Sequence, residues 1–319
     1  MINHPLPLRI EAIHPVALGV RSFTLRHRDG SALPPFEAGA HIELLLPNGL
    51  TRSYSLLNAP GETNSYQVAV HQSPTSNGGS RYMHESLTEG LVLQATEPRN
   101  HFPLNEQAAR TCLIAGGIGV TPLMAMARRL SALGRPWELH VCARTPEHAA
   151  FVTELQALAD ESGNRLLCHF DHVPGGKSLD IAALVGASAP DTHFYCCGPN
   201  GMLEAFEAAT AGCRDRAHVE YFTPKAEAAL DGGFEVKLAQ SGLVLQVPAG
   251  RSILDVVTEA GINVLTSCRE GICGSCETRI IEGQADHRDS VLSPEEQEEN
   301  TTMMICCSGA RSPRLVLDL

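Results

Sequence analysis

Three cysteines lie within nine residues of the C-terminal part of this chain, in the run SCREGICGSCE (267–277). Their spacing, C-x4-C-x2-C, is one that holds a [2Fe–2S] cluster through cysteine thiolates. Gly271 and Gly274 allow the sharp backbone turns that make thiolates converge, and they leave backbone N–H groups facing the sulfurs. The run therefore predicts an iron–sulfur site whose first three ligands are Cys268, Cys273 and Cys276.

A fourth ligand is expected downstream of this run, where Cys306 and Cys307 stand side by side. The residues alone leave the choice between these two open. Zinc is the alternative metal, but zinc sites more usually contain two close pairs of ligands. The six remaining cysteines are scattered among apolar residues, and ordinary burial is expected for all of them except Cys197.

A second candidate site is the glycine-rich run AGGIGVTP (115–122), between a strand-like segment and a helical one. Glycines there let backbone N–H groups approach a pyrophosphate, and a helix N-terminus favours its negative charge. Gly117 and Gly119 fit the G-x-G-x-x-G pattern, whereas Pro122 occupies the third glycine position. We expect Thr121 to cap the helix and Pro122 to start it. A plain tight turn is the alternative interpretation.

The end of the second predicted strand of this region bears on which nicotinamide cofactor binds. An NAD site usually has Asp or Glu there, whereas this chain has Arg144 and Thr145 after HVCA. The Arg144 guanidinium is suited to bind the 2′-phosphate of NADP, or else it is simply solvated. The residues therefore leave NADH and NADPH both open.

A third candidate site is the strand-like run RSYSL (52–56). Alternate residues of a strand share a face, so Arg52 and Tyr54 offer together a cation for phosphate and a ring for stacking on a flat heterocycle. The run GGS (78–80) opens a predicted helix and adds an anion site, which suits the terminal phosphate of FMN. An ordinary strand with a core tyrosine is the alternative.

The first hundred residues, which contain this third site, are predicted to be β structure. Two strand-like runs, 41–47 and 51–57, are joined by Asn48-Gly49, a strong hairpin signal. A glycine turn further on predicts a short helix that ends at Gly90. Many short strands with one helix indicate a small antiparallel barrel.

From about residue 104 the pattern changes to an alternation of strands and helices. TCLIA (111–115) and WELHVCAR (137–144) are strand-like, AAFVTELQALADES (149–162) is helical, and HVEYF (218–222) predicts the last strand. This alternation predicts a doubly wound, parallel α/β sheet.

A linker-like run, TPKAEAALDGG (223–233), follows the alternating region. Beyond it a hairpin, a helix and the cysteine run predict a small α+β domain. The chain is therefore predicted to be multidomain, with a flavin barrel at 1–103, a nucleotide domain at 104–224, a linker at 225–233 and an iron–sulfur domain at 234–319.

Composition and charge limit the class of protein. The 319 residues are 43% hydrophobic and 19% charged, as in globular proteins, and the net charge of −12 argues against nucleic acid or an anionic membrane as a partner. The N-terminal residues show no secretory signal, and no stretch reaches the about 18 apolar residues of a membrane span. We therefore expect a cytoplasmic protein, in which eleven cysteines do not form a disulfide framework.

Taken in order, the runs RSYSL, AGGIGVTP, CCGPNGM, HVEYF, CREGICGSC and CCSGARSPRLVLDL resemble the phthalate dioxygenase reductase family, to which vanillate demethylase reductases are similar. The resemblance covers essentially the full chain. It implies an FMN-binding antiparallel barrel, a nicotinamide-binding α/β domain and a C-terminal plant-type ferredoxin domain. It also implies electron transfer from NADH through FMN to a [2Fe–2S] cluster, and then to a Rieske-type oxygenase.

The resemblance further implies roles for individual residues. Flavin contacts are expected from Arg52, Ser53, Tyr54 and Ser55, and contacts to its phosphate from Gly78, Gly79 and Ser80. The dinucleotide is expected at Gly116, Gly117, Gly119 and Thr121, and its nicotinamide at Cys197, Gly198 and Pro199. Phe222 is expected over the isoalloxazine ring, and Ser55, Cys197 and Phe222 are the predicted catalytic positions. A buried core thiol is the alternative for Cys197.

The same resemblance decides the fourth cluster ligand and the outline of the reaction. Cys306, separated from Cys276 by residues 277–305, aligns with that ligand, which leaves Cys307 as a packed neighbour. Hydride transfer between stacked rings needs no proton shuttle, so no histidine is assigned a catalytic role. A monomer is expected. A cytochrome P450 as acceptor, or a redox-sensing module in place of an enzyme, are the alternatives.

Overall fold

The computed structural model describes residues 5–74 and 78–319. These residues form two compact units, one that ends at Phe222 and one that spans Thr223–Leu319, and each is described by itself. The N-terminal residues 1–4 and Asn77, which begins the predicted glycine turn, lie outside the described part. Within the described ranges, no helix is long and apolar enough to cross a bilayer.

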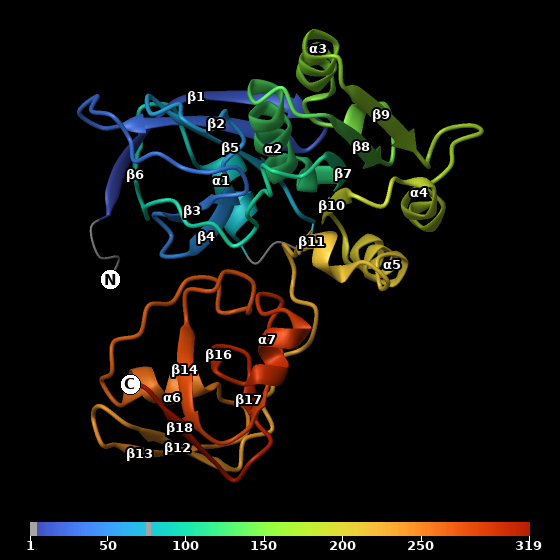
Figure 1. The fold of residues 1–319 in the computed structure, drawn as a ribbon. Helices are drawn as coiled ribbons and strands as arrows, with labels where there is room; N and C mark the ends of the chain where they lie inside the picture. Colours follow the sequence, from blue (N-terminus) through green and yellow to red (C-terminus); the bar gives the residue numbers. More distant parts are fainter. Residues whose placement is uncertain (1–4, 75–77) are drawn as a thin grey trace. The chain divides into compact units, whose positions relative to one another are not determined.

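The first unit begins with a curled sheet of six antiparallel strands in the order β4-β3-β6-β1-β2-β5. The strands are β1 (Leu6–Ala17), β2 (Val20–His27), β3 (His41–Leu45), β4 (Thr51–Ser55), β5 (Tyr66–His71) and β6 (Val92–Ala95). The two ends of this order approach each other, because the Leu57 N–H just beyond β4 donates to the carbonyl of Gln67 in β5 at 3.0 Å. The predicted antiparallel flavin barrel is confirmed as this curled sheet (Figure 1).

The hairpin predicted from Asn48-Gly49 is confirmed. Gly49 has a φ of +83°, in the left-handed region that glycine adopts at little cost, and the Asn48 side chain accepts from the Leu50 N–H at 3.2 Å. The helix α1 (Gly79–Glu85) is shorter than predicted. It ends at Glu85, and the Gly90 N–H donates to the carbonyl of Ile10 in β1.

The rest of the first unit is a parallel five-stranded sheet in the order β11-β10-β7-β8-β9, as predicted for a doubly wound domain. Its strands are β7 (Arg110–Gly116), β8 (Trp137–Ala143), β9 (Arg165–Phe170), β10 (Thr192–Cys197) and β11 (Ala217–Glu220). Its helices are α2 (Val120–Ala132), α3 (Val152–Ser162), α4 (Ile181–Ala187) and α5 (Asn200–Ala209), with short 3₁₀ turns at Gly117–Gly119, Pro146–His148 and Arg214–Arg216.

These helices cover both faces of the parallel sheet (Figure 1). On one face Leu113 and Leu139 pack in a core with residues of α2 and α3, such as Leu123. On the other face Cys112 packs in a core with Leu203 of α5. The first core also contains barrel residues, so the barrel and the parallel sheet share one interior.

Two predicted helix starts in this domain are wrong. Thr121 does not cap α2, because the 3₁₀ turn at Gly117–Gly119 continues directly into a helix that begins at Val120. The Thr121 hydroxyl instead donates to the carbonyl of Ile118 at 3.0 Å. The helix α3 starts at Val152 rather than at residue 149, since Phe151 has a φ of +62° and breaks the helical backbone.

The second unit is the predicted α+β domain. It contains a mixed sheet in the order β13-β12-β18-β14-β16 and a two-stranded sheet of β15 and β17. The elements are β12 (Phe234–Leu238), β13 (Val244–Val247), α6 (Ile253–Glu259), β14 (Glu277–Glu282), β15 (Ala285–Asp286), α7 (Pro294–Glu299), β16 (Thr302–Met304), β17 (Gly309–Ala310) and β18 (Arg314–Leu317). The predicted linker is hydrogen-bonded to this domain: Ala229 N–H donates to Cys307 O and Gly250 N–H to Leu230 O, both at 2.8 Å.

Candidate active site and iron–sulfur site

The glycine run 115–122 and the run CCGP meet at the carboxyl edge of the parallel sheet. Strand order reverses between β7 and β10, which is where open α/β sheets bind ligands. A Cβ added to Gly119 would lie 2.1 Å from the Cys197 carbonyl oxygen, and one added to Gly116 would lie 2.5 Å from Pro199 Cδ. Only glycine permits this approach, so the fold brings together Gly116, Gly119, Cys197, Gly198 and Pro199.

The other residues predicted to bind the dinucleotide differ in whether they are accessible to a ligand. Gly117 has a φ of +54°, and an added Cβ there would meet nothing within 4 Å, so this side of the loop is open. Thr121 is buried with its hydroxyl bonded to Ile118, so it holds the loop rather than presenting a free group. Arg144 is exposed two residues beyond Cys142, the partner of Gly116 in the β7–β8 register, which puts it at the same sheet edge.

The flavin candidates of the barrel gather around one arginine. Arg52 on β4 lies over the start of α1, where a Cβ added to Gly79 would be 2.7 Å from its Nε atom. Gly78 precedes this turn with a φ of +93°, and the Ser80 hydroxyl accepts from the Ser73 N–H at 3.2 Å. The positive charge of Arg52 therefore lies beside the turn that begins α1, which suits a phosphate.

The other three flavin candidates on the strand β4 alternate between its two faces. Tyr54 shares the face of Arg52, and burial raises the pKa of its phenol, which stays neutral. Ser53 and Ser55 share the opposite face, and the Ser53 hydroxyl is buried with no hydrogen-bond partner among the described residues. An orphaned hydroxyl is costly, so a flavin that accepts or donates a hydrogen bond there fits the site.

Cys197 ends β10 beside the core that the barrel and the parallel sheet share. It is fully buried, and burial first and the neighbouring Glu220 second raise the pKa of its thiol well above the usual value. Phe222 packs against the same core, which also contains Leu57 just beyond β4. The thiol is therefore protonated at neutral pH, which fits a role in shaping the crevice and not one as a nucleophile.

Sequence reasoning missed Glu220, the register partner of Cys197 on β11. Its carboxyl is buried, its Oε2 atom has no hydrogen-bond partner in the described part of the chain, and burial raises its pKa to about 8. The signal was a lone glutamate inside the apolar run HVEYF, where a charge is costly unless it is paired or neutralised. At neutral pH this wall of the crevice is therefore predominantly uncharged.

Replacing Glu220 with glutamine should stabilise the first unit progressively as pH rises. Between about pH 4.5 and 8 the folded protein retains a proton on this carboxyl that the unfolded chain has lost, so stability falls with rising pH. The slope is at most about 1.4 kcal/mol per pH unit, and Glu220→Gln removes it. Denaturation at pH 5 and pH 8, followed through the fluorescence of Trp137, the single tryptophan, measures the difference. A gap between variant and wild type that does not change with pH would mean that Glu220 is ionised normally.

The cysteine run folds into a loop whose thiols crowd together. Three of the predicted ligands are at most 6% exposed and Cys268 is half-buried; the three are Cys273, Cys276 and Cys306. The Cys268 sulfur accepts from the Glu270 N–H at 3.3 Å and interacts with the Cys273 and Cys306 thiols. Thiols packed this closely, with a backbone N–H aimed at one of them, fit a [2Fe–2S] cluster held by thiolates.

Two glycines and Cys307 fix the shape of the cysteine loop. Gly271 and Gly274 both have positive φ, of +71° and +72°, as the predicted turns require. A Cβ added to Gly271 would lie 2.4 Å from the Cys307 sulfur, so this thiol packs directly behind the loop. The Cys307 sulfur also donates a long hydrogen bond to the carbonyl of Met304. These contacts support Cys306 as the ligand and Cys307 as its packed neighbour.

Comparison with known proteins agrees with these two sites. Residues 113–208 match the family model of the oxidoreductase NAD-binding domain, and residues 236–311 match that of the 2Fe-2S iron-sulfur cluster binding domain. The chain is 48% identical to the phenoxybenzoate dioxygenase subunit beta of Ectopseudomonas oleovorans, over 99% of this chain and 98% of that protein. It also matches a solved structure of phthalate dioxygenase reductase with a TM-score of 0.72 and 38% identity, over 99% of this chain and 98% of the other. The chain belongs to the phthalate dioxygenase reductase family.

Family membership confirms the predicted class of enzyme. The protein is an NADH-dependent flavin and iron–sulfur oxidoreductase, and its cofactors are FMN, a [2Fe–2S] cluster and NADH, as predicted. The chain also matches part of a larger protein, an intact type IV self-sufficient cytochrome P450 monooxygenase. That structure matches with a TM-score of 0.89 and 36% identity over 99% of this chain, which spans 41% of the monooxygenase.

Proposed function

We propose that this reductase, as a monomer, passes electrons from NADH through FMN and the [2Fe–2S] cluster to a Rieske-type oxygenase. The observation that carries the proposal is the combination, in one chain, of a dinucleotide crevice with uncharged walls and a site of four buried or half-buried thiols, three of them in one loop. The similarity to a dioxygenase subunit and to phthalate dioxygenase reductase supports an oxygenase as acceptor. The proposed domains are the FMN-binding barrel at 1–103, the NAD-binding domain at 104–224 and the iron–sulfur domain at 234–319, with a linker at 225–233 before the last.

In this proposal the barrel residues bind and orient FMN. Arg52 holds the phosphate together with the N–H groups of the turn at Gly78, Gly79 and Ser80, since the guanidinium already lies over that turn. Tyr54, Ser53 and Ser55, its neighbours on β4, are the residues that would hold the rest of the flavin. Bound FMN supplies the conversion between two-electron and one-electron transfer, and the protein supplies position and electrostatics.

The crevice residues orient the nicotinamide in the same proposal. The open side of Gly117 and the close-packed Gly116 and Gly119 give the dinucleotide a backbone surface. Cys197 and Phe222 bound the space for the reacting rings. An ionised carboxylate in the crevice would oppose any gain of negative charge by the bound rings. The predominantly neutral Glu220 avoids that repulsion.

A cytochrome P450 is the second candidate acceptor. The observation that favours it is the high similarity to the reductase portion of a self-sufficient P450 monooxygenase. Both acceptors take one electron at a time, so the same chain is chemically suited to either.

Anaerobic mixing of the NADH-reduced protein with each acceptor tests the proposal. One syringe would contain an oxidised Rieske-type oxygenase and a parallel one a ferric, substrate-bound P450 under carbon monoxide. We expect the oxygenase cluster to be reduced at a rate fast enough for turnover, and the haem to be reduced much more slowly. Fast reduction of the haem, with no reduction of the oxygenase cluster, would favour a cytochrome P450 as the acceptor. A protein that stays reduced with both would contradict both acceptors and favour the sensor.

A further inference from the structure

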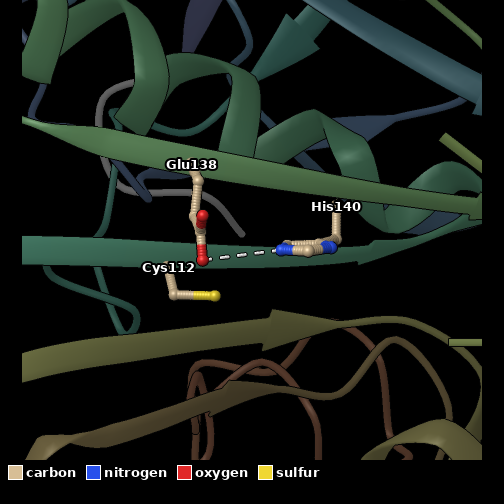
Figure 2. A group of neighbouring side chains, drawn as sticks. All are labelled: Cys112, Glu138 and His140. Atoms are coloured by element: carbon tan, nitrogen blue, oxygen red, sulfur yellow. Dashed lines mark ion pairs between the residues drawn. The ribbon is translucent and has the colours of Figure 1, made fainter. Parts of the chain in front are cut away.

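A second group of metal-binding side chains lies in the first unit, whereas the iron–sulfur loop belongs to the second. Among the described residues, Cys112, Glu138 and His140 each offer one ligand atom, and these atoms lie within 4.8 Å of one another (Figure 2). Cys112 on β7 is the register partner of Glu138 on β8, and His140 follows two residues later on the same face. We propose that Cys112, Glu138 and His140 bind a zinc ion.

The imidazole of His140 gives the independent sign of a ligand. His140 is only 5% exposed, and its Nε2 atom has no hydrogen-bond partner in the part of the chain that the structure describes. The nearest Glu138 oxygen is 3.6 Å from Nε2, just beyond hydrogen-bond length. Glu138 is therefore an ion-pair partner of this nitrogen without a hydrogen bond (Figure 2). A buried ring nitrogen that makes no hydrogen bond is costly, and a cation between the imidazole and the carboxylate removes that cost.

The other ring nitrogen of His140 is held as in a metal-bound histidine. His140 Nδ1 lies 2.9 Å from His169 Nε2, and the two rings stack with centroids 5.2 Å apart. With its proton on Nδ1, the His140 ring donates to His169 Nε2. The His140 Nε2 lone pair then faces Cys112 and Glu138. Ligating histidines usually donate their second N–H to a fixed partner in this way.

The set of donors selects the metal. One sulfur, one imidazole nitrogen and one carboxylate oxygen suit Zn²⁺, which takes four ligands in a tetrahedron with a solvent molecule in an open position. With zinc–ligand bonds of about 2.0 Å, an N···O edge of that tetrahedron is roughly 3.3 Å, close to the 3.6 Å observed. On binding, the Cys112 S–H bond breaks, its proton goes to solvent and the sulfur bonds to the metal.

The surroundings allow a metal to enter and to be held. The Glu138 side chain is 28% exposed, so it connects the buried sulfur and imidazole to solvent. Its other oxygen is 3.5 Å from the Arg165 guanidinium, whose largely exposed side chain can orient the carboxylate. Cys112 precedes Gly116 by four residues, about 13 Å along the strand, and packs on the α4 and α5 side. The proposed site is thus separate from the dinucleotide crevice.

Without metal, the same atoms would form a protonated polar cluster, in which the Cys112 thiol donates to Glu138. A measurement of metal binding by the full-length protein, with its flavin and cluster in place, distinguishes the zinc site from such a metal-free cluster. Equilibrium dialysis against Zn²⁺ would be followed by metal analysis and by X-ray absorption at the zinc edge. We expect one zinc per chain with one sulfur and two or three nitrogen or oxygen neighbours.

Three variants make this test specific. Cys112→Ser should lose the sulfur neighbour and weaken zinc binding by more than the about 100-fold typical of an outer-shell change. The matched control Cys168→Ser, on β9, should bind zinc as the wild type does. If Cys112→Ser fails to fold, Glu138→Gln at the half-exposed position should show the same weakening. No bound zinc, unchanged binding in both site variants, or a spectrum with sulfur neighbours only would overturn the proposal.

Discussion

Cys306→Ala is expected to abolish the [2Fe–2S] cluster while NADH still reduces the flavin. Cys306 is buried beside the Cys268 thiol, where a fourth thiolate completes the ligand set. Loss of a ligand should lower electron transfer to a one-electron acceptor by more than about 100-fold, the upper range for removing an outer-shell partner. Iron analysis, the visible spectrum and stopped-flow reduction by NADH would show the loss of the cluster and the retained flavin step.

Cys307→Ala is the matched control, since it makes the same change in the next residue and in an equally buried side chain. The Cys307 sulfur fills the space behind Gly271, so this variant should lose some stability but keep its iron and its rate. The opposite pattern, with the cluster lost in Cys307→Ala and kept in Cys306→Ala, would exchange the two roles. Loss of the cluster in both variants would show that packing behind the loop matters as much as ligation.

The sequence predicted best those features that depend on neighbouring residues alone. Asn48-Gly49 predicted a hairpin because its turn chemistry is local, and the hairpin is there. The boundary of α1 could not be predicted in the same way. The Gly90 N–H that was expected to end the helix is paired with Ile10, eighty residues away in the sequence.

The candidate sites differ in the same way: some lie within one short segment, and others need two strands side by side. The cysteine spacing and the glycine run carry their chemistry in short segments, so the sequence located both loops. The segment HVEYF marks Glu220 only as a lone glutamate among apolar residues; its raised pKa depends on burial beside Cys197 from another strand. Cys112 and His140 were hidden for the same reason: only the β7–β8 register puts their side chains on one face.

Gly119→Ala is expected to cause the largest loss in the NADH half of the reaction. An added methyl group would lie 2.1 Å from the Cys197 carbonyl oxygen and 2.9 Å from the Gly198 nitrogen, both backbone atoms that cannot rotate away. The two loops must therefore separate, at a cost of about 1–3 kcal/mol or more for overpacking. Because these loops form the proposed crevice, kcat/KM for NADH should fall at least about 10-fold, as 1.4 kcal/mol corresponds to tenfold.

Stopped-flow reduction of the flavin by NADH, with dithionite as a chemical reductant in parallel, isolates this effect. Dithionite should reduce the variant like the wild type, because it needs no dinucleotide site. Gly186→Ala in α4 is the control: its backbone is not in the left-handed region and its Cβ would meet nothing within 4 Å. That change should leave NADH reduction intact and add up to about 1 kcal/mol of helix stability. Wild-type kinetics in a folded Gly119→Ala protein would mean that the nicotinamide does not depend on the contact between these two loops.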